Sequence, residues 1–205
     1  MIAESNRDRR AERREATRAE ILDAAWQLAR EEGLAGLSLR DVAARVGMRP
    51  PSLYWYFDSK HAIYDAMFAE GNRQLLARVR AMDWPEEPRA LLRAVARVFV
   101  DFVVDDPARA QLLFQRSIPD FEPSPESYAP AVEVLGLAAE QFAAIGIDDP
   151  ADLDLWTALL AGLSSQQLAN DPGGERWTRL VDDAVDMYAD HVLPAGNRTT
   201  PRRSR

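Results

Sequence analysis

The residues best suited to chemistry fall in one stretch, residues 49–60, which mixes basic, hydroxyl and aromatic side chains. Leu53 and Phe57 are four residues apart, so a helix would bury both on one face. The residues that would then face outward are Ser52, Trp55 and Tyr56, with Tyr54 on the flank. Outward aromatic side chains are unusual on a short helix, but they suit phosphate oxygens, sugars and thymine methyl groups. The pattern indicates contact with a nucleic acid, with packing beneath another helix as the alternative.

Lys60 is the only lysine of the 205 residues, and it closes this stretch. The sequence predicts a helix that begins at Lys60, and the helix macrodipole disfavours a cation in the first turn. A bound anion such as a phosphate would offset that cost, whereas an ordinary solvated lysine is the alternative. Arg40 and Arg49 are further basic residues of the same region.

Two short helices joined by a tight turn would present these side chains. Ser38 is a good N-cap, because its hydroxyl can accept a hydrogen bond from a free amide of the next turn. Apolar residues recur on one face of residues 39–46, and Gly47 can adopt the left-handed conformation that reverses the chain. Pro50 and Pro51 fit the first turn of the second helix, whose amides have no partner within the helix.

A longer helix is predicted before this pair. Small and apolar residues recur at three- and four-residue steps from Ile21 to Ala29, and Gly33 would end the helix. Residues 1–16 carry five arginines among small and acidic residues, without an apolar stripe. Two interpretations of this segment stay open: a flexible arm that frays, or a basic arm beside the phosphate backbone or the minor groove.

The composition excludes several classes of function. With 47% apolar residues the chain can form a sizeable core, and without cysteine it has no disulfide, cysteine zinc site or thiol nucleophile. No apolar run approaches the roughly 18 residues of a membrane span, so we expect a cytoplasmic protein that does not enter a membrane. The two histidines fit no metal motif and no Gly-rich phosphate loop is present. We therefore expect no catalytic residues, no metal site and no cofactor.

The charge is distributed unevenly along the chain. The net charge is −8, but residues 1–60 carry 11 basic against 10 acidic side chains, and the remaining residues carry 14 against 23. DNA binding depends on the local charge of the contact surface, so a near-neutral first part on an acidic body is compatible with it.

Beyond residue 60 the pattern is helical throughout, without strand-like alternation. The predicted helices cover residues 60–80, 89–105, 107–115, 125–144, 150–170 and 175–192. A Pro-rich connector at residues 84–88 and a Pro-rich loop at residues 118–125 separate some of them. The sequence therefore predicts an all-α protein.

Two sets of residues in this part are candidates for binding. Aromatic and apolar side chains of the middle helices would line a ligand pocket, although such residues at helical spacing more often fill a core. These candidates are Phe68, Phe99, Phe102, Phe114, Phe121, Tyr128, Leu135, Phe142 and Trp156. The last helix is apolar on more than one face and so needs two partners. The expected dimer surface, with burial inside the monomer as the alternative, comprises Leu159, Gly162, Leu163, Trp177, Leu180, Val181, Ala184 and Tyr188.

Three motifs within residues 21–67 have specific spacing. They are Ile21-Leu22-Asp23-Ala24-Ala25, the set Ala43, Gly47 and Leu53, and the run Leu53-Tyr54-Trp55-Tyr56-Phe57 followed by Lys60. Together they resemble the N-terminal domain of the tetracycline-repressor (TetR) family of bacterial transcriptional regulators. The resemblance implies an N-terminal three-helix domain with a helix-turn-helix that enters the major groove, and a C-terminal helical domain for ligand binding and dimerisation.

The resemblance also implies roles for single residues. The DNA-binding set would be Ser38, Arg40, Arg49, Pro50, Ser52, Tyr54, Trp55, Tyr56 and Lys60. Ser38 and Lys60 would reach phosphates, and Arg49 would face base edges or phosphates. Pro51 departs from the small residue usual in the family and lacks a backbone donor. Trp55 is bulkier than the usual residue, so a base preference does not transfer.

These inferences combine into one expectation, a ligand-responsive transcriptional regulator. It would be a homodimeric repressor that binds a palindromic operator in double-stranded DNA and is released by a small, largely apolar organic molecule. The expected organisation is a flexible basic arm (1–16), a DNA-binding domain (17–62), a helical regulatory and dimerisation domain (63–193) and a disordered tail (194–205). A helical interaction module that has lost DNA binding is the alternative, supported by Pro51.

Overall fold

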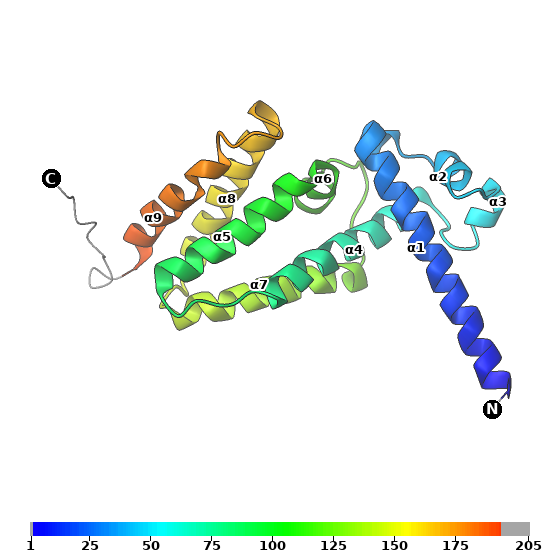
Figure 1. Ribbon diagram of the computed structural model, residues 1–205, viewed down its shortest axis with the longest axis horizontal. Coiled ribbons are helices and arrows are strands. Elements are labelled where there is room, and N and C mark those ends of the chain that lie inside the picture. Colours follow the sequence, from blue (N-terminus) through cyan, green and yellow to red (C-terminus); the bar gives the residue numbers. More distant parts are fainter. Residues whose placement is uncertain (1, 194–205) are drawn as a thin grey trace. The chain divides into compact units, whose positions relative to one another are not determined.

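The computed structural model describes residues 2–193, with side chains from residue 9 onward. This part of the chain forms α-helices and one short 3-10 turn and contains no strand, which confirms the predicted all-α fold (Figure 1). The helices are α1 (Ile2–Gly36), α2 (Leu39–Arg45), α3 (Pro50–Leu53), α4 (Lys60–Arg80), α5 (Pro88–Asp105), α6 (Pro107–Phe114), α7 (Pro125–Ala144), α8 (Pro150–Asn170) and α9 (Val181–Val192). The expected tail at 194–205 lies outside the described residues.

Helix α1 begins at Ile2, whereas the apolar pattern predicts a start near Thr17. Arginine, glutamate and alanine dominate the preceding turns, and all three favour a helix even where no apolar face exists. At the other end the helical conformation is interrupted at Gly33, the residue predicted to end the helix, which has a φ of 78°.

The chain folds into two compact units. The N-terminal unit contains the residues up to Arg73 and also Asp106–Pro130, and the C-terminal unit contains Gln74–Asp105 and the residues from Ala131 onward. The sequence predicts that the boundary between the DNA-binding and the regulatory domain follows residue 62. Helix α6 joins the N-terminal unit because it packs against α1, which no local pattern in the sequence indicates.

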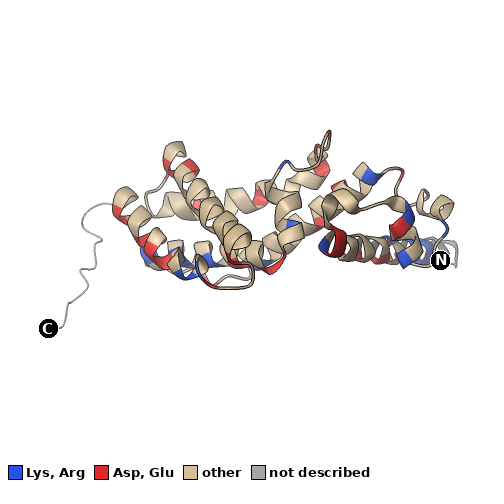
Figure 2. Cartoon of the chain, turned by 90° about the horizontal axis from the view of Figure 1, so that it is seen from above, with Lys and Arg blue, Asp and Glu red and all other residues tan. Residues whose placement is uncertain are grey.

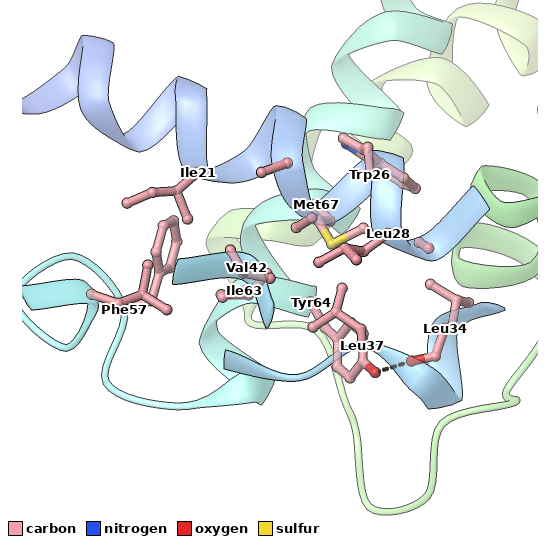
Figure 3. Close-up of a cluster of buried hydrophobic side chains, with 14 of the residues drawn as sticks. Ile21, Trp26, Leu28, Leu34, Leu37, Val42, Phe57, Ile63, Tyr64 and Met67 are labelled. Atoms are coloured by element: carbon pink, nitrogen blue, oxygen red, sulfur yellow. Dashed lines mark hydrogen bonds between the residues drawn. The ribbon is translucent and has the colours of Figure 1, made fainter. Parts of the chain in front are cut away.

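The core of the N-terminal unit is built from α1, α2, the residues around α3, and the first half of α4. Ile21 and Ile63 are fully buried in it, and Phe57 is 2% exposed (Figure 3). Leu53 is also fully buried in this core. The hydroxyl of Tyr64 in α4 donates a hydrogen bond to the carbonyl oxygen of Leu34 near the end of α1. This bond ties the first turns of α4 to α1.

In the C-terminal unit, α5 packs against both α8 and α9. Its core contains an aromatic series in which the ring centroids of Phe142 and Trp156 are 5.2 Å apart and those of Trp156 and Tyr188 are 5.1 Å apart. The Tyr188 hydroxyl donates to the carbonyl oxygen of Asp152 at 3.0 Å. Burial is the main reason that the pKa of Tyr188 is raised to about 12, with the nearby Asp152 carboxylate adding to it.

A row of ion pairs also joins α5 to α9. Arginines spaced four residues apart on α5 meet aspartates spaced four residues apart on α9, so the two helices run antiparallel with matched charges (Figure 2). The pairs are Arg89 with Asp190, Arg93 with Asp186, and Arg97 with Asp182. The hydrogen bond to Asp182 raises the pKa of the Arg97 guanidinium above its ordinary value.

The last helix begins at Val181, six residues later than the predicted start near Glu175, and a 3-10 turn, Thr178–Leu180, precedes it. The cause is the buried side chain of Gln167, which is 2% exposed. Its Oε1 accepts from the backbone nitrogens of Trp177 at 2.9 Å and of Thr178 at 3.3 Å, and its Nε2 donates to the carbonyl oxygen of Gly174 at 3.0 Å. These bonds hold the connection between α8 and α9 as a folded loop.

Candidate nucleic-acid interface

The turn between α2 and α3 forms as predicted. Ser38 is the N-cap of α2, and its hydroxyl accepts from the backbone nitrogen of Asp41 at 3.2 Å. Gly47 has a φ of 67°, and the Met48 nitrogen donates to the carbonyl oxygen of Ala43 at 2.8 Å. The Ser38 hydroxyl also donates to the Asp41 carboxylate, so a phosphate would have to compete with Asp41 for it.

The recognition segment, residues 49–60, begins with α3, a helix of only four residues. The chain then continues through a turn in which the nitrogens of Tyr56 and Phe57 donate to the carbonyl oxygen of Leu53 at 2.9 and 3.0 Å. Leu53 is fully buried and Phe57 is 2% exposed, which confirms that they share the core face. Trp55 is 81% exposed and Tyr54 is 54% exposed. Two large exposed side chains, Tyr54 and Trp55, thus lie between two buried ones, Leu53 and Phe57, in the sequence.

Tyr56 differs from its neighbours, because its side chain is half-buried and packs against the core. For Tyr56, the alternative of packing within the fold therefore fits better than an outward contact with a nucleic acid. The remaining predicted residues, Arg40, Arg49, Pro50 and Ser52, are exposed or partly exposed. Arg40 has 85% of its side chain exposed, and its nearest acid is Asp41 at 3.8 Å.

Two arginines of α1 hold the end of the recognition segment. Arg18 Nη1 donates to the carbonyl oxygen of Tyr56 at 2.7 Å, and its guanidinium lies over the Phe57 ring, 4.3 Å from the centroid. Arg14 Nη2 donates to the carbonyl oxygen of Trp55 at 3.4 Å. These carbonyls belong to the turn after a very short helix, where no further helical turn supplies donors. This role is not predicted above, although the four-residue spacing of Arg14 and Arg18 places both on one face of the helix.

Lys60 opens α4 after the N-cap Ser59, whose hydroxyl accepts from the Ala62 nitrogen at 3.0 Å. The Lys60 ammonium donates to the carbonyl oxygen of Ala35 at 3.1 Å and lies 5.4 Å from the centroid of the Tyr64 ring. An ammonium has three protons, so this single bond leaves further donors for an anion. Lys60 therefore fixes the end of α1 and still fits the predicted phosphate contact.

An ion pair joins α1 to α2 on the same unit. Arg45 donates to both carboxylate oxygens of Glu31, at 2.8 and 2.5 Å. This hydrogen bond lowers the pKa of Glu31 and raises that of Arg45. The pair neutralises Arg45, whereas Arg14, Arg18 and Lys60 donate to uncharged carbonyls and keep their charge.

Comparison with known proteins agrees with this geometry. Residues 21–67 match the family described as bacterial regulatory proteins, tetR family. The tetracycline repressor protein class D of Escherichia coli is 40% identical over 53 residues, which are 26% of this chain and 24% of that protein. The HTH-type transcriptional regulator Mb1846 of Mycobacterium bovis is 29% identical over 144 residues, which are 66% of this chain and 60% of that protein.

The matched part of the chain, residues 21–67, belongs to the tetR family. The matched residues contain α2, α3 and the first turns of α4, so its helix-turn-helix is the DNA-binding domain of that family, whose members are transcriptional regulators and not enzymes. A solved bacterial regulatory protein of the tetR family from Rhodococcus RHA1 shares the fold, with a TM-score of 0.64, 21% identity, and coverage of 87% of this chain and 97% of that one. The chain covers less than two thirds of the length of either curated relative.

The predicted pocket residues divide between the two units. In the N-terminal unit, Phe68, Phe114, Phe121 and Tyr128 line one cavity of about 430 Å³ with Gln115, Arg116 and Glu122. In the C-terminal unit, Phe142 and Trp156 lie in the core and Phe99 packs against it. Phe102 is fully buried, with the Arg78 guanidinium 5.2 Å from its centroid, and Leu135 is 62% exposed. The structure thus brings four of the nine together around a cavity.

The predicted dimer residues divide as well. Val181, Ala184 and Tyr188 are buried in the core of the C-terminal unit, because α9 turns its apolar faces toward α5 and α8. Leu159 and Leu163 pack partly against that core, and Trp177 and Leu180 are half-buried. Gly162 is exposed on α8. For the buried three, the alternative of burial inside the monomer is the one that the structure favours.

Two further kinds of feature are absent from the described part of the chain. No helix among residues 2–193 is both long and apolar enough to cross a membrane. No group of three or more His, Asp or Glu side chains in the described part of the chain is arranged to hold a metal ion.

Proposed function

We propose that this chain is a homodimeric, cytoplasmic transcriptional repressor that binds a palindromic operator through its recognition segment and releases it when a small, largely apolar organic molecule binds. The observation that carries the DNA part is the exposure of Trp55 and Tyr54 beside the buried Leu53 and Phe57. Rigid anchors on one side of a turn and bare aromatic rings on the other suit contact with sugars, phosphates and thymine methyl groups.

The charge of this surface supports the same partner. Arg14, Arg18 and Lys60 donate to backbone carbonyls, which are neutral, so their positive charges remain available to phosphates. Arg49 and Arg40 add exposed charge at the start of the segment and on α2. The tetracycline repressor that the chain resembles is a repressor by name, which is the reason to propose repression here.

The dimer would use the exposed side of α8 instead of the buried part of α9. Leu155 is 46% exposed there, and Ala158, Gly162 and Ser165 follow on the same face at three- and four-residue steps. Small residues let two helices approach closely, and a two-fold dimer of helix-turn-helix domains reads half-sites about one helical turn apart. Leu155→Asp in a sedimentation experiment is expected to yield monomers, and a stable dimer of that variant would refute this face.

The effector would occupy the cavity between Phe68, Phe114, Phe121 and Tyr128. Its volume of about 430 Å³ is within the usual range for small-molecule sites, and the Phe68 and Tyr128 rings lie within 13° of parallel with centroids 5.8 Å apart. A largely apolar molecule with a planar part suits these walls.

A hydrogen-bonded cluster connects this cavity to the recognition segment. Asp65, one turn before Phe68 on α4, accepts from the Ser124 nitrogen at 2.7 Å and from the hydroxyls of Ser124 at 2.9 Å and Ser127 at 2.7 Å. A ligand that displaces Tyr128 would pull on Ser127 and so on Asp65, whose helix begins at Lys60. Such a ligand shifts the DNA equilibrium only if it binds the two arrangements with different affinity.

The first experiment is a pull-down of genomic fragments with the full chain, followed by sequencing and by gel shifts on the recovered sequence. Trp55→Ala and Tyr54→Ala are expected to weaken binding strongly. Leu135→Ala is the matched control, because the exposure of Leu135, 62%, lies between those of Trp55 and Tyr54 and the residue belongs to the other unit. Specific binding that survives both aromatic substitutions would refute the assignment, and its absence in the wild-type chain would favour an interaction module without DNA binding.

The second experiment separates ligand binding from DNA release. A screen of apolar aromatic compounds is expected to find one that raises the melting temperature and releases DNA. Asp65→Ala should keep the rise in melting temperature and lose the release. If Asp65→Ala releases DNA as the wild type does, the proposed connection is wrong.

A further inference from the structure

The first turns of α1 have no role in the core. Every described side chain from Arg9 to Ala16 is exposed, and the first fully buried residue of the helix is Ile21. These turns therefore gain nothing from burial, yet they carry four arginines, at positions 9, 10, 13 and 14. An exposed helical extension of this kind needs an explanation other than folding.

The hydrogen bonds of Arg18 and Arg14 fix which face of this extension is turned to the recognition segment. Arg18 reaches the carbonyl of Tyr56 and Arg14 reaches the carbonyl of Trp55, so the row of arginines at four-residue steps follows the recognition segment outward. Arg10 is the next member of the row and lies about 6 Å further along the axis, at 1.5 Å per residue. Arg10 is exposed.

The positive charge of this row of arginines favours an anionic partner. Residues 9–18 contain five arginines and two glutamates in a chain whose net charge is −8. A positive row that begins at a DNA-reading surface meets the phosphates flanking the site that this surface reads. From Arg18 to Arg10 the row is about 12 Å long, which is the length of three or four base pairs at 3.4 Å each.

We propose that Arg10 and Arg14 of α1 form a second DNA-contacting surface, which binds backbone phosphates outside the half-site read by the recognition segment. This inference rests on the proposed function. It assigns to α1 a contribution to affinity that is independent of base sequence, and it makes the preferred site longer than the helix-turn-helix alone would need.

The test measures affinity by fluorescence anisotropy on two duplexes with the same recovered operator, one trimmed to the operator and one extended by ten base pairs on each side. The wild-type chain is expected to bind the extended duplex more tightly and with a steeper salt dependence. Arg10→Ala should lose most of that gain, and its salt slope should be shallower by about one per protomer. Arg10→Lys should retain the slope, because a phosphate contact needs the charge.

The matched control is Arg9→Ala, which removes the same charge from the neighbouring residue, about 100° around the helix. Equal losses for Arg9→Ala and Arg10→Ala would mean a general charge effect and would overturn the proposal. So would a wild-type chain that binds both duplexes equally, although the proposed function would then stand. A wild-type chain that recognises neither duplex would refute the proposed function itself.

Discussion

The arginines beside the recognition segment and those on α5 of the C-terminal unit are used in opposite ways. At the recognition segment, Arg14 and Arg18 donate to backbone carbonyls, and the nearest partner of Lys60 is also a carbonyl. In the C-terminal unit, Arg93 and Arg97 on α5 meet carboxylates of α9. A carbonyl orders a cation without neutralising it, whereas a carboxylate cancels its charge.

This difference explains how an acidic chain can keep a surface for an anionic partner. The net charge of −8 concerns the whole molecule, but affinity for phosphates depends on the charge at the contact. On α5, Arg89, Arg93 and Arg97 are neutralised by ion pairs with α9, whereas the arginines of α1 that hold the recognition segment stay charged. The side chains that hold the recognition segment are therefore the same ones that we propose to contact phosphates.

The largest expected effect comes from comparing a buried and an exposed residue of the recognition segment, Phe57 and Trp55. Phe57→Ala removes a buried ring and the support of Arg18, so it should destabilise the chain by about 3–5 kcal/mol. Trp55→Ala removes a ring that is 81% exposed, so its stability should stay within about 0.5 kcal/mol of the wild type while DNA affinity falls. Urea unfolding and anisotropy measure the two effects. If Trp55→Ala lost as much stability as Phe57→Ala, Trp55 would contribute to folding instead of DNA binding.

The contrast between these positions also shows what the sequence can and cannot predict. In the recognition segment, Leu53 and Phe57 are set by helical spacing, so the outward position of Trp55 follows from the sequence. Helix starts marked by an N-cap and a proline, such as the start of α8 at Pro150, also depend only on neighbouring residues and can therefore be predicted from the sequence.

What sequence reasoning missed depends on contacts between residues far apart in the chain. The Arg18 bond to Tyr56 spans 38 positions, and the hydrogen bonds of Gln167 decide where α9 begins. Apolar periodicity on α9 indicates that Val181 and Tyr188 need partners, but α5 and α8 supply these within the chain. Spacing gives the face of a helix; it does not identify what covers that face.

A second prediction concerns a polar residue on which the C-terminal unit depends. Gln167→Leu keeps the side chain large but leaves the Gly174 carbonyl and the nitrogens of Trp177 and Thr178 without their partner. The expected loss is about 2–3 kcal/mol in the free energy of unfolding, because unmade buried hydrogen bonds cost more than made ones contribute. The adjacent Gln166→Leu is the control, since Gln166 is exposed. A similar loss in both variants would contradict the assignment.

A third prediction uses pH to probe the core of the same unit. Burial raises the pKa of Tyr188 to about 12, above the value near 10 expected in the unfolded chain. The folded state holds the proton more tightly, so the stabilisation is complete below pH 10 and is lost as the pH rises toward 12. Unfolding experiments between pH 9 and 12 should show a decline on the order of 2 kcal/mol from this group. In Tyr188→Phe the decline should be smaller, and an unchanged decline would assign it to other groups.

The smallest expected effect tests the ion-pair row itself. Arg93 and Asp186 are each about 40% exposed, and surface pairs of this kind contribute about 0–1 kcal/mol. The buried Nε of Arg93 has no hydrogen-bond partner, so part of its desolvation is uncompensated and the low end of that range is expected. A double-mutant cycle with Arg93→Ala and Asp186→Ala measures the coupling, and 1 M salt should reduce it.

This result bears on the comparison between the units. If the coupling is small, the row on α5 and α9 mainly sets the register of two antiparallel helices and neutralises cations that would otherwise attract phosphates. Replacing Asp186 by Asn should then leave stability nearly unchanged and increase non-specific DNA binding at low salt. A coupling well above 1 kcal/mol would instead make the row a principal support of the C-terminal unit, and the contrast with the charged, carbonyl-bound arginines of α1 would concern stability as much as charge.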